Sequence, residues 1–250
     1  MAQTGTLILG QYKVIRILKM RENYVAVQAV DILDRQQSIR LLNIYEGMAA
    51  RRYAQVFLDV HHCPEFLGTR LDGESLIAVF TWRDAPMIDS VFFADSGQKW
   101  FDRLNYAEML FRFVLNLWDQ PTELGCAALR SCNLCVLELD QKLCVNYCVE
   151  PTEKKPDRRE LICLAGDQAK KILFQTWTTE LPQRRFLLEL IGGRWKDAVQ
   201  LNSAWNIARP QIEDAYTKRE GRMLIRRIFG RVLMNIRWSR EEKRSIYGKK

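Results

Sequence analysis

The chain has 250 residues, of which 48% are hydrophobic and 27% are charged, and its formal net charge is +8. This composition is typical of a soluble globular protein. No stretch approaches the roughly 18 consecutive apolar residues of a membrane span, and the N-terminus lacks the features of a secretory signal, so a cytoplasmic location is expected.

Seven cysteines and two histidines restrict the chemistry that the chain can support. Cys132 and Cys135 have one C-x-x-C spacing, which alone is a weak zinc signal, and reduced thiols in the core are the favoured interpretation. His61 and His62 are adjacent, whereas a hydrolase triad needs a histidine beside a nucleophile elsewhere. Neither a metal site nor a catalytic triad is expected.

In chain order, the first 82 residues show the patterns of five short strands and one helix. Apolar residues recur at every second position in the strands and at helical spacing in the helix, and Asp72-Gly73 is a hairpin signal. Further helices are expected within residues 105–118 and from 161 to about 216, after a charged linker at 150–160. The predicted order is strands at 10–18, 24–32 and 38–44, a helix at 49–61, and strands at 66–71 and 75–82.

The C-terminal segment carries the positive charge. Residues 217–250 contain 12 Lys and Arg and 3 Glu, a net charge of +9, so the rest is almost neutral. Apolar residues recur there every three or four positions, as in a basic amphipathic helix. This helix either packs on the domain with its arginines in water or lies on an anionic membrane surface, with nucleic acid a less favoured partner. The arginines expected to meet an anionic surface are Arg222, Arg226, Arg227, Arg231 and Arg237.

The order of strands and helix resembles the small lobe of a protein kinase of the bacterial Ser/Thr type. The segment CAALRSCNLCVLELDQKLCVNYCVEP, from Cys126 onward, resembles the catalytic loop, the next hairpin and the DFG segment of that family. The resemblance covers about residues 8–150. It implies an α+β, bilobal fold: a five-stranded antiparallel N-lobe with one helix (1–82), a trimmed helical C-lobe carrying the degenerate catalytic and DFG segments (83–216), and the basic amphipathic tail (217–250).

The matching positions lack most groups that kinases use for phosphoryl transfer. The segment 18–24, in the place of the glycine-rich loop, has no glycine. Arg40 is aligned with the ATP-orienting lysine, and its glutamate partner would fall near Ala54 or Gln55.

The catalytic loop and the DFG segment are altered in the same way. Ala128 replaces the aspartate base, and Asn146 replaces the DFG aspartate, which leaves a poorer magnesium ligand. Only Asn133 of the catalytic set is retained.

The resemblance therefore implies a pseudokinase, not an enzyme, that acts as a protein-binding scaffold or allosteric regulator. Its general layout is similar to that of EssB/YukC-type secretion pseudokinases, which would place it at the inner face of a membrane. Two alternatives remain open: an atypical nucleotide-binding enzyme, and a membrane or nucleic-acid binder acting through the tail. No cofactor is expected, although weak metal-independent ATP binding would use the cleft residues Arg40, Val79, Phe80, Trp82, Asn133 and Asn146.

Overall fold

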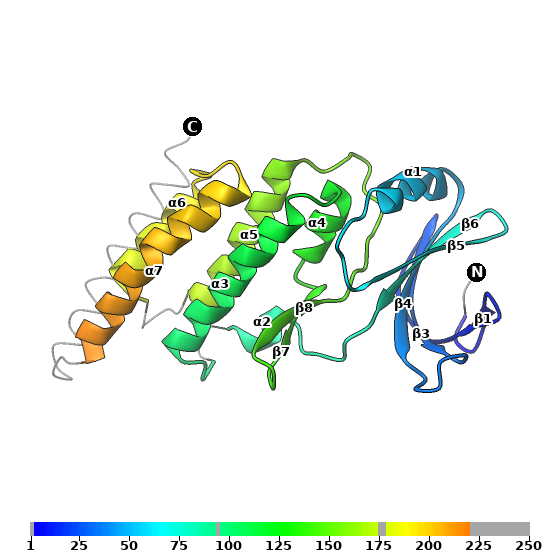
Figure 1. The fold of residues 1–250 in the computed structure, drawn as a ribbon, viewed down its shortest axis with the longest axis horizontal. Helices are drawn as coiled ribbons and strands as arrows, with labels where there is room; N and C mark the ends of the chain where they lie inside the picture. Colours follow the sequence, from blue (N-terminus) through cyan, green and yellow to red (C-terminus); the bar gives the residue numbers. More distant parts are fainter. Residues whose placement is uncertain (1–2, 94–95, 175–178, 221–250) are drawn as a thin grey trace. The chain divides into compact units, whose positions relative to one another are not determined.

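The structure, a computed structural model, describes residues 3–93, 96–174 and 179–220. The chain divides into two compact units. Unit 1 comprises the chain up to Met87 together with Leu117–Leu139 and Cys144–Asp157. Unit 2 comprises Ile88–Asn116, Asp140–Leu143 and the chain from Arg158 onward. The first unit is built on a sheet and the second on helices (Figure 1).

Unit 1 contains a six-stranded antiparallel sheet in the order β1-β2-β3-β4-β6-β5. The five predicted strands are all present, but the predicted number of strands was wrong. A two-residue strand, too short to show alternation, precedes them and is folded back by Leu9 and Gly10, which both have positive φ. The strands are β1 (Leu7–Ile8), β2 (Tyr12–Arg21), β3 (Tyr24–Asp31), β4 (Ile39–Tyr45), β5 (Phe66–Asp72) and β6 (Ser75–Thr81).

Each face of this sheet has its own apolar core. Helix α1 (Gly47–Leu58) buries Tyr53 and Phe57 against one face, where Tyr53 stacks on Tyr45 of β4 with ring centroids 4.6 Å apart. The other face holds a cluster that includes Leu42 and Val79. Residues of opposite parity along one strand therefore enter different cores.

Helix α1 ends earlier than the sequence indicated. Its last residue is Leu58 and Asp59 is the C-cap residue, so His61 and His62 lie beyond the helix. The predicted end at residue 61 was wrong, because apolar periodicity continues through Val60 although the backbone has already left the helix.

The rest of unit 1 contains most of the predicted catalytic-loop region, of which Asp140–Leu143 belong to unit 2. Helix α4 (Thr122–Ala128) leads to the hairpin of β7 (Leu134–Leu137) and β8 (Lys142–Val145). Between Val145 and Arg158 the chain forms neither helix nor strand, in agreement with the predicted linker.

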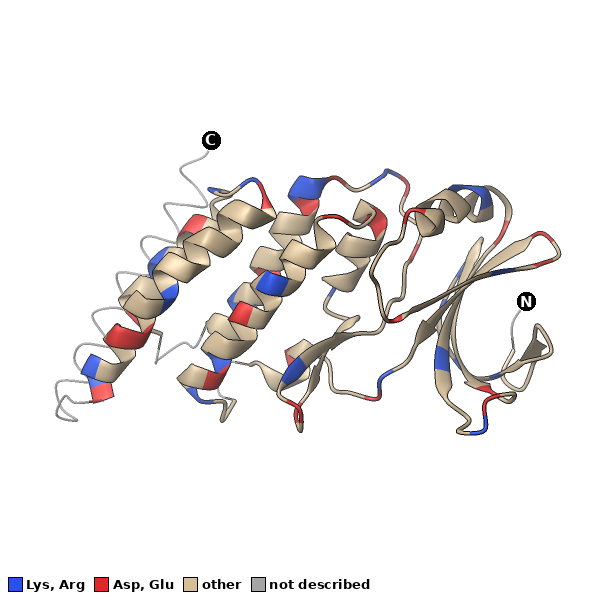
Figure 2. Cartoon of the chain, viewed as in Figure 1, with Lys and Arg blue, Asp and Glu red and all other residues tan. Residues whose placement is uncertain are grey.

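Unit 2 consists mainly of helices within its described residues. Its core joins Phe111, Phe186 and Trp205, whose ring centroids lie 5.1–5.6 Å apart. Acidic and basic residues are interspersed along the longer helices rather than gathered on one of them (Figure 2). The helices are α2 (Ile88–Val91), α3 (Trp100–Leu117), α5 (Arg158–Leu173), α6 (Leu181–Ile191) and α7 (Ala198–Glu220).

The predicted basic tail begins within α7 and then leaves the described part of the chain. The five arginines expected at an anionic surface lie outside the described residues: Arg222, Arg226, Arg227, Arg231 and Arg237. Of the helices that the structure describes, none is both long and apolar enough to cross a bilayer.

Candidate functional site

Side chains from β4 hold the backbone of the segment that follows β8. We call residues 146–152 the post-β8 segment. Asn43 donates from Nδ2 to the carbonyl oxygen of Tyr147 (2.8 Å) and accepts at Oδ1 from the backbone N–H of Val149 (2.9 Å). The hydroxyl of Tyr45, two residues along the same face of β4, donates to the Val149 carbonyl (2.7 Å). One strand thus makes three hydrogen bonds to this segment.

Helix α1 holds the later part of the post-β8 segment. The Tyr53 hydroxyl donates to the carbonyl of Glu150 (3.3 Å), and Arg52 Nη1 donates to the carbonyl of Thr152 (2.6 Å). Arg52 is itself oriented by Glu123 of α4, 3.5 Å away. Sheet and helix together therefore leave the backbone of this segment little freedom to rearrange.

Aromatic side chains fill the space around Asn43. Tyr24 of β3 is only 2% exposed, and its hydroxyl donates to Asn43 Oδ1 (2.7 Å). The ring of Phe80 stacks on that of Tyr147 with centroids 5.2 Å apart. Asn43 is completely buried, so its amide is sealed from water by these rings.

The two predicted asparagines meet at the base of the β7–β8 hairpin. The backbone N–H of Asn146 donates to the carbonyl of Asn133 (2.9 Å). The Asn133 side chain donates to the carbonyls of Ala127 (2.8 Å) and Cys148 (3.0 Å). The Asn146 amide both accepts from the N–H of Arg83 and donates to its carbonyl, each at 2.9 Å. Both side chains are therefore engaged with backbone groups.

The other predicted cleft residues do not all join this cluster. Phe80 does, whereas Val79, its neighbour, enters the core of the opposite face. Arg40 lies three residues before Asn43 and so faces the other side of β4, where it pairs with Asp31 (3.9 Å) and Asp34 (3.3 Å).

Ala128 and Trp82 complete the predicted set. Ala128 is completely buried as the last residue of α4. Trp82 is half-buried, and its backbone N–H donates to the carbonyl of Ile39 (3.3 Å).

Burial raises the pKa values of three tyrosines and one cysteine of the site further above neutral pH. It raises the pKa values of Tyr24, Tyr45 and Tyr147 well above the usual value for tyrosine. Burial also raises the pKa of Cys148 to about 12, so its thiol remains protonated. General acid–base catalysts and cysteine nucleophiles need a pKa near or below the working pH, which these groups do not have.

Glu150 is the one strongly paired acid of the post-β8 segment. It accepts from Lys19 and from Arg21 Nε (2.9 Å) at the tip of the β2–β3 hairpin, and it lies 3.6 Å from Arg130. Burial opposes its ionisation, but the hydrogen bonds from Lys19 and Arg21 outweigh that effect and lower its pKa. The hairpin in the place of the glycine-rich loop is thus tied to the post-β8 segment.

Replacing Glu150 with glutamine should make this tie weaker at neutral pH. A carboxylate with a lowered pKa stabilises the fold above its unfolded-state pKa, and the stabilisation is lost as the pH falls through the folded-state value. We expect Glu150→Gln to lower the unfolding free energy by about 1 kcal/mol at pH 7 and by less near pH 3. Urea unfolding at both pH values measures this. The exposed Glu74→Gln serves as the control, and a difference that did not change with pH would contradict the assignment.

Sequence reasoning missed Asn43, Tyr24 and Glu150. One signal for Asn43 was present: in SIRLLNIY it is a lone polar residue at the same parity as Leu41 and Tyr45, hence on a buried face. The hydrogen bonds of Glu150 link residues about 130 positions apart, which no local pattern indicates.

Comparison with known proteins bears on the fold. No protein-family profile matches the chain, and no curated protein matches its sequence. The kinase domain of Mycobacterium tuberculosis PknI is similar, with a TM-score of 0.54 and 12% identity over 83% of this chain and 100% of that chain. A double mutant of that domain gives a TM-score of 0.55 and 11% identity over 84% of this chain and 100% of that chain. The predicted kinase-like α+β fold, an N-terminal antiparallel sheet with a helix followed by a helical part, is confirmed.

Proposed function

We propose that this chain is a pseudokinase, a domain with a kinase-like fold that does not transfer phosphate and acts by binding another protein. The observation that carries the proposal is the buried Asn43, whose amide is hydrogen bonded to the post-β8 segment. A kinase needs charged groups in this region, and here a neutral amide and aromatic rings occupy it.

The ion pair of an active kinase has no counterpart among the side chains of β4 and α1 at this site. In that family a lysine on the strand before the regulatory helix orients the ATP phosphates and pairs with a glutamate of that helix. In this chain the β4 side chains that reach the segment after β8 are Asn43 and Tyr45, and neither has a charge to offer. On α1, the side chain that stacks against β4 is Tyr53 rather than an acid.

The residues in the places of the metal ligands and of the base lack the groups that a kinase uses there. Kinases hold magnesium through the DFG aspartate and the catalytic-loop asparagine. Here the matching Asn146 and Asn133 use their amides on backbone groups of Arg83, Ala127 and Cys148. Ala128 has no group that could accept a proton.

The hairpin in the place of the glycine-rich loop is unsuited to phosphate binding. A glycine-rich loop lets backbone amides approach the phosphates. The β2–β3 hairpin has side chains instead, and two of them, Lys19 and Arg21, are paired with Glu150. Tyr24 lies inside, hydrogen bonded to Asn43. A nucleotide would have to break these contacts in order to bind, which favours a scaffold over a nucleotide-responsive enzyme.

A thermal-shift titration with ATP tests the loss of nucleotide chemistry. We expect the melting temperature to stay unchanged at ATP concentrations up to about 1 mM, with and without magnesium or manganese, because only ligands bound by the native state raise it. An active kinase domain measured in parallel serves as the positive control. Metal-dependent stabilisation would instead support an enzyme, and a metal-independent shift would support a nucleotide-responsive regulator.

The protein-binding part of the proposal has a separate test. Affinity purification of the tagged full chain from its own cells should recover one protein in near-stoichiometric amount, equally with and without added ATP. Recovery of the partner protein only in the presence of ATP would argue against an ATP-independent protein scaffold. Recovery of lipid without any partner protein would also argue against it.

A further inference from the structure

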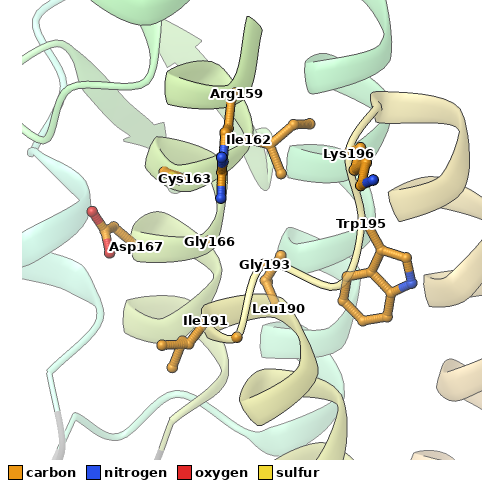
Figure 3. Close-up of a pocket in the computed structure, with 11 residues that line it drawn as sticks. Arg159, Ile162, Cys163, Gly166, Asp167, Leu190, Ile191, Gly193, Trp195 and Lys196 are labelled. Carbon is orange, nitrogen blue, oxygen red and sulfur yellow. The ribbon is translucent and has the colours of Figure 1, made fainter. Parts of the chain in front are cut away.

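Unit 2 contains a cavity that lies apart from the post-β8 segment. It has a volume of about 770 Å³ and opens between α5 and the turn that follows α6 (Figure 3). Helix α5 contributes Arg159, Ile162 and Cys163, while α6 and the turn contribute Leu190, Trp195 and Lys196. Its volume is within the range of about 300–1,000 Å³ that small-molecule sites have.

Glycines on both sides shape this cavity. A Cβ atom on Gly166 of α5 would lie 3.3 Å from Leu190 Cγ, so glycine lets α6 approach closely at the floor. Gly193 has a positive φ of 69° and turns the chain away after α6, and the space where its Cβ would lie is open. The turn therefore forms a wall without side chains at this point.

The lining combines free positive charge with apolar surface. Within the described residues, the side chains of Arg159 and Lys196 have no hydrogen-bond or ion-pair partner. Figure 3 shows the Arg159 side chain extending along the opening. Asp167 also lines the cavity, so the lining holds two cationic side chains and one acidic side chain. Ile162 and Leu190 are 4% and 5% exposed, so the inner wall is apolar.

We propose that this cavity binds a small amphipathic organic anion, with its acidic group paired to Arg159 and Lys196. The apolar body would lie against Ile162, Leu190 and the indole of Trp195. A simple inorganic anion would leave the apolar wall in water, and a neutral apolar molecule would leave both cations without a counter-charge. Only a ligand with both parts satisfies both surfaces. The site goes beyond the proposed scaffold function and uses none of its residues.

Anilinonaphthalene sulfonate, a fluorescent amphipathic anion, serves as the probe. We expect saturable binding to the full chain, weakened roughly tenfold by Arg159→Glu or Lys196→Glu, because charge reversal replaces attraction by repulsion at the sulfonate. Arg35→Glu makes the same charge change in an exposed turn of unit 1 and should leave this binding unaltered. Phenylnaphthylamine, which lacks the sulfonate, should bind at least about tenfold more weakly.

Alkylation of Cys163 locates the bound probe. Among the cysteines only Cys132 and Cys163 are exposed, and Cys163 lines the cavity. With saturating probe, iodoacetamide should modify Cys163 at least about fivefold more slowly, with no change at Cys132, as followed by mass spectrometry of each cysteine. Three outcomes would overturn the proposal: unchanged alkylation of Cys163, equal protection by phenylnaphthylamine or by inorganic phosphate, or binding that ignores both charge reversals.

Discussion

Replacing Asn43 with alanine is expected to lower the unfolding free energy of unit 1 by about 3–5 kcal/mol. The change leaves three groups without their partner: the Tyr24 hydroxyl, the Tyr147 carbonyl and the Val149 N–H. Each buried polar group that loses its hydrogen bond costs roughly 1–3 kcal/mol. The loss is large compared with a total stability of about 5–15 kcal/mol. Urea unfolding, with hydrogen exchange resolving the peptides of unit 1, measures it.

Gln36→Ala is the matched control for Asn43→Ala. It deletes a side-chain amide from the same unit, but at an exposed turn position where the described structure gives that amide no partner. Its effect should stay within about 0.5 kcal/mol. Similar small effects of both variants would show that Asn43 does not secure the post-β8 segment, and the proposed loss of kinase function would lose its main support.

Replacing Asn133 with aspartate should lower the unfolding free energy as much as Asn43→Ala does, and the size of this loss should depend on pH. The native amide donates to two carbonyl oxygens, and an ionised carboxylate in that place would face both without a proton to donate. We expect a loss of about 3–5 kcal/mol at pH 7, since a buried charge without a partner is strongly unfavourable. Because burial raises the folded-state pKa of the introduced carboxyl, the loss grows as the pH rises above about 4.

Magnesium makes Asn133→Asp a test of function as well as of stability. If this position were a working metal ligand, a carboxylate would bind magnesium more strongly, and added magnesium would stabilise the variant. We expect no such rescue in unfolding experiments from pH 4 to pH 8 with and without the ion. Asn23→Asp, in the exposed β2–β3 turn, should be almost neutral throughout and serves as the control.

Asn43 and Asn133 suggest what became of the ligand-binding positions of a kinase in the proposed pseudokinase. A kinase keeps polar groups in this region unsatisfied by protein so that they can meet ATP and magnesium. Here the side-chain amides of Asn43 and Asn133 are hydrogen bonded to the backbone between Tyr147 and Val149. Polar side chains that bind a ligand in an enzyme would then fix the backbone of the post-β8 segment, and this region would be rigid instead of catalytic.

Much of the fold could be predicted from the chain because its signals are local. Alternation in YVAVQAVD and the Asp72-Gly73 turn correspond to β3 and to the β5–β6 hairpin. The resemblance to the kinase catalytic loop and DFG segment placed Asn133 and Asn146 on either side of one hairpin, and their backbones do meet there. The two-residue β1 was missed because it has no periodicity and exists only through pairing with β2.

The candidate site and the cavity were less accessible to sequence reasoning. Arg40 was predicted for the place of the lysine because it carries the charge, whereas Asn43 and Tyr45 are the β4 residues that hydrogen bond to the post-β8 segment. Once the lysine itself is absent, several neighbouring positions fit the motif equally well. Similarly, nothing in residues 158–196 marks a cavity, because its two walls come from separate helices.

By itself the sequence determined the kinds of most elements and their order, because periodicity and turn residues act over a few positions, and its resemblance to kinases predicted the loss of the kinase acids. The tertiary structure alone decided which side chains converge. Asn43 and Val149 are 106 positions apart, and their hydrogen bond depends on β4 and the post-β8 segment being brought together. Such long-range contacts leave no mark in local composition, since any polar residue of suitable size can make them.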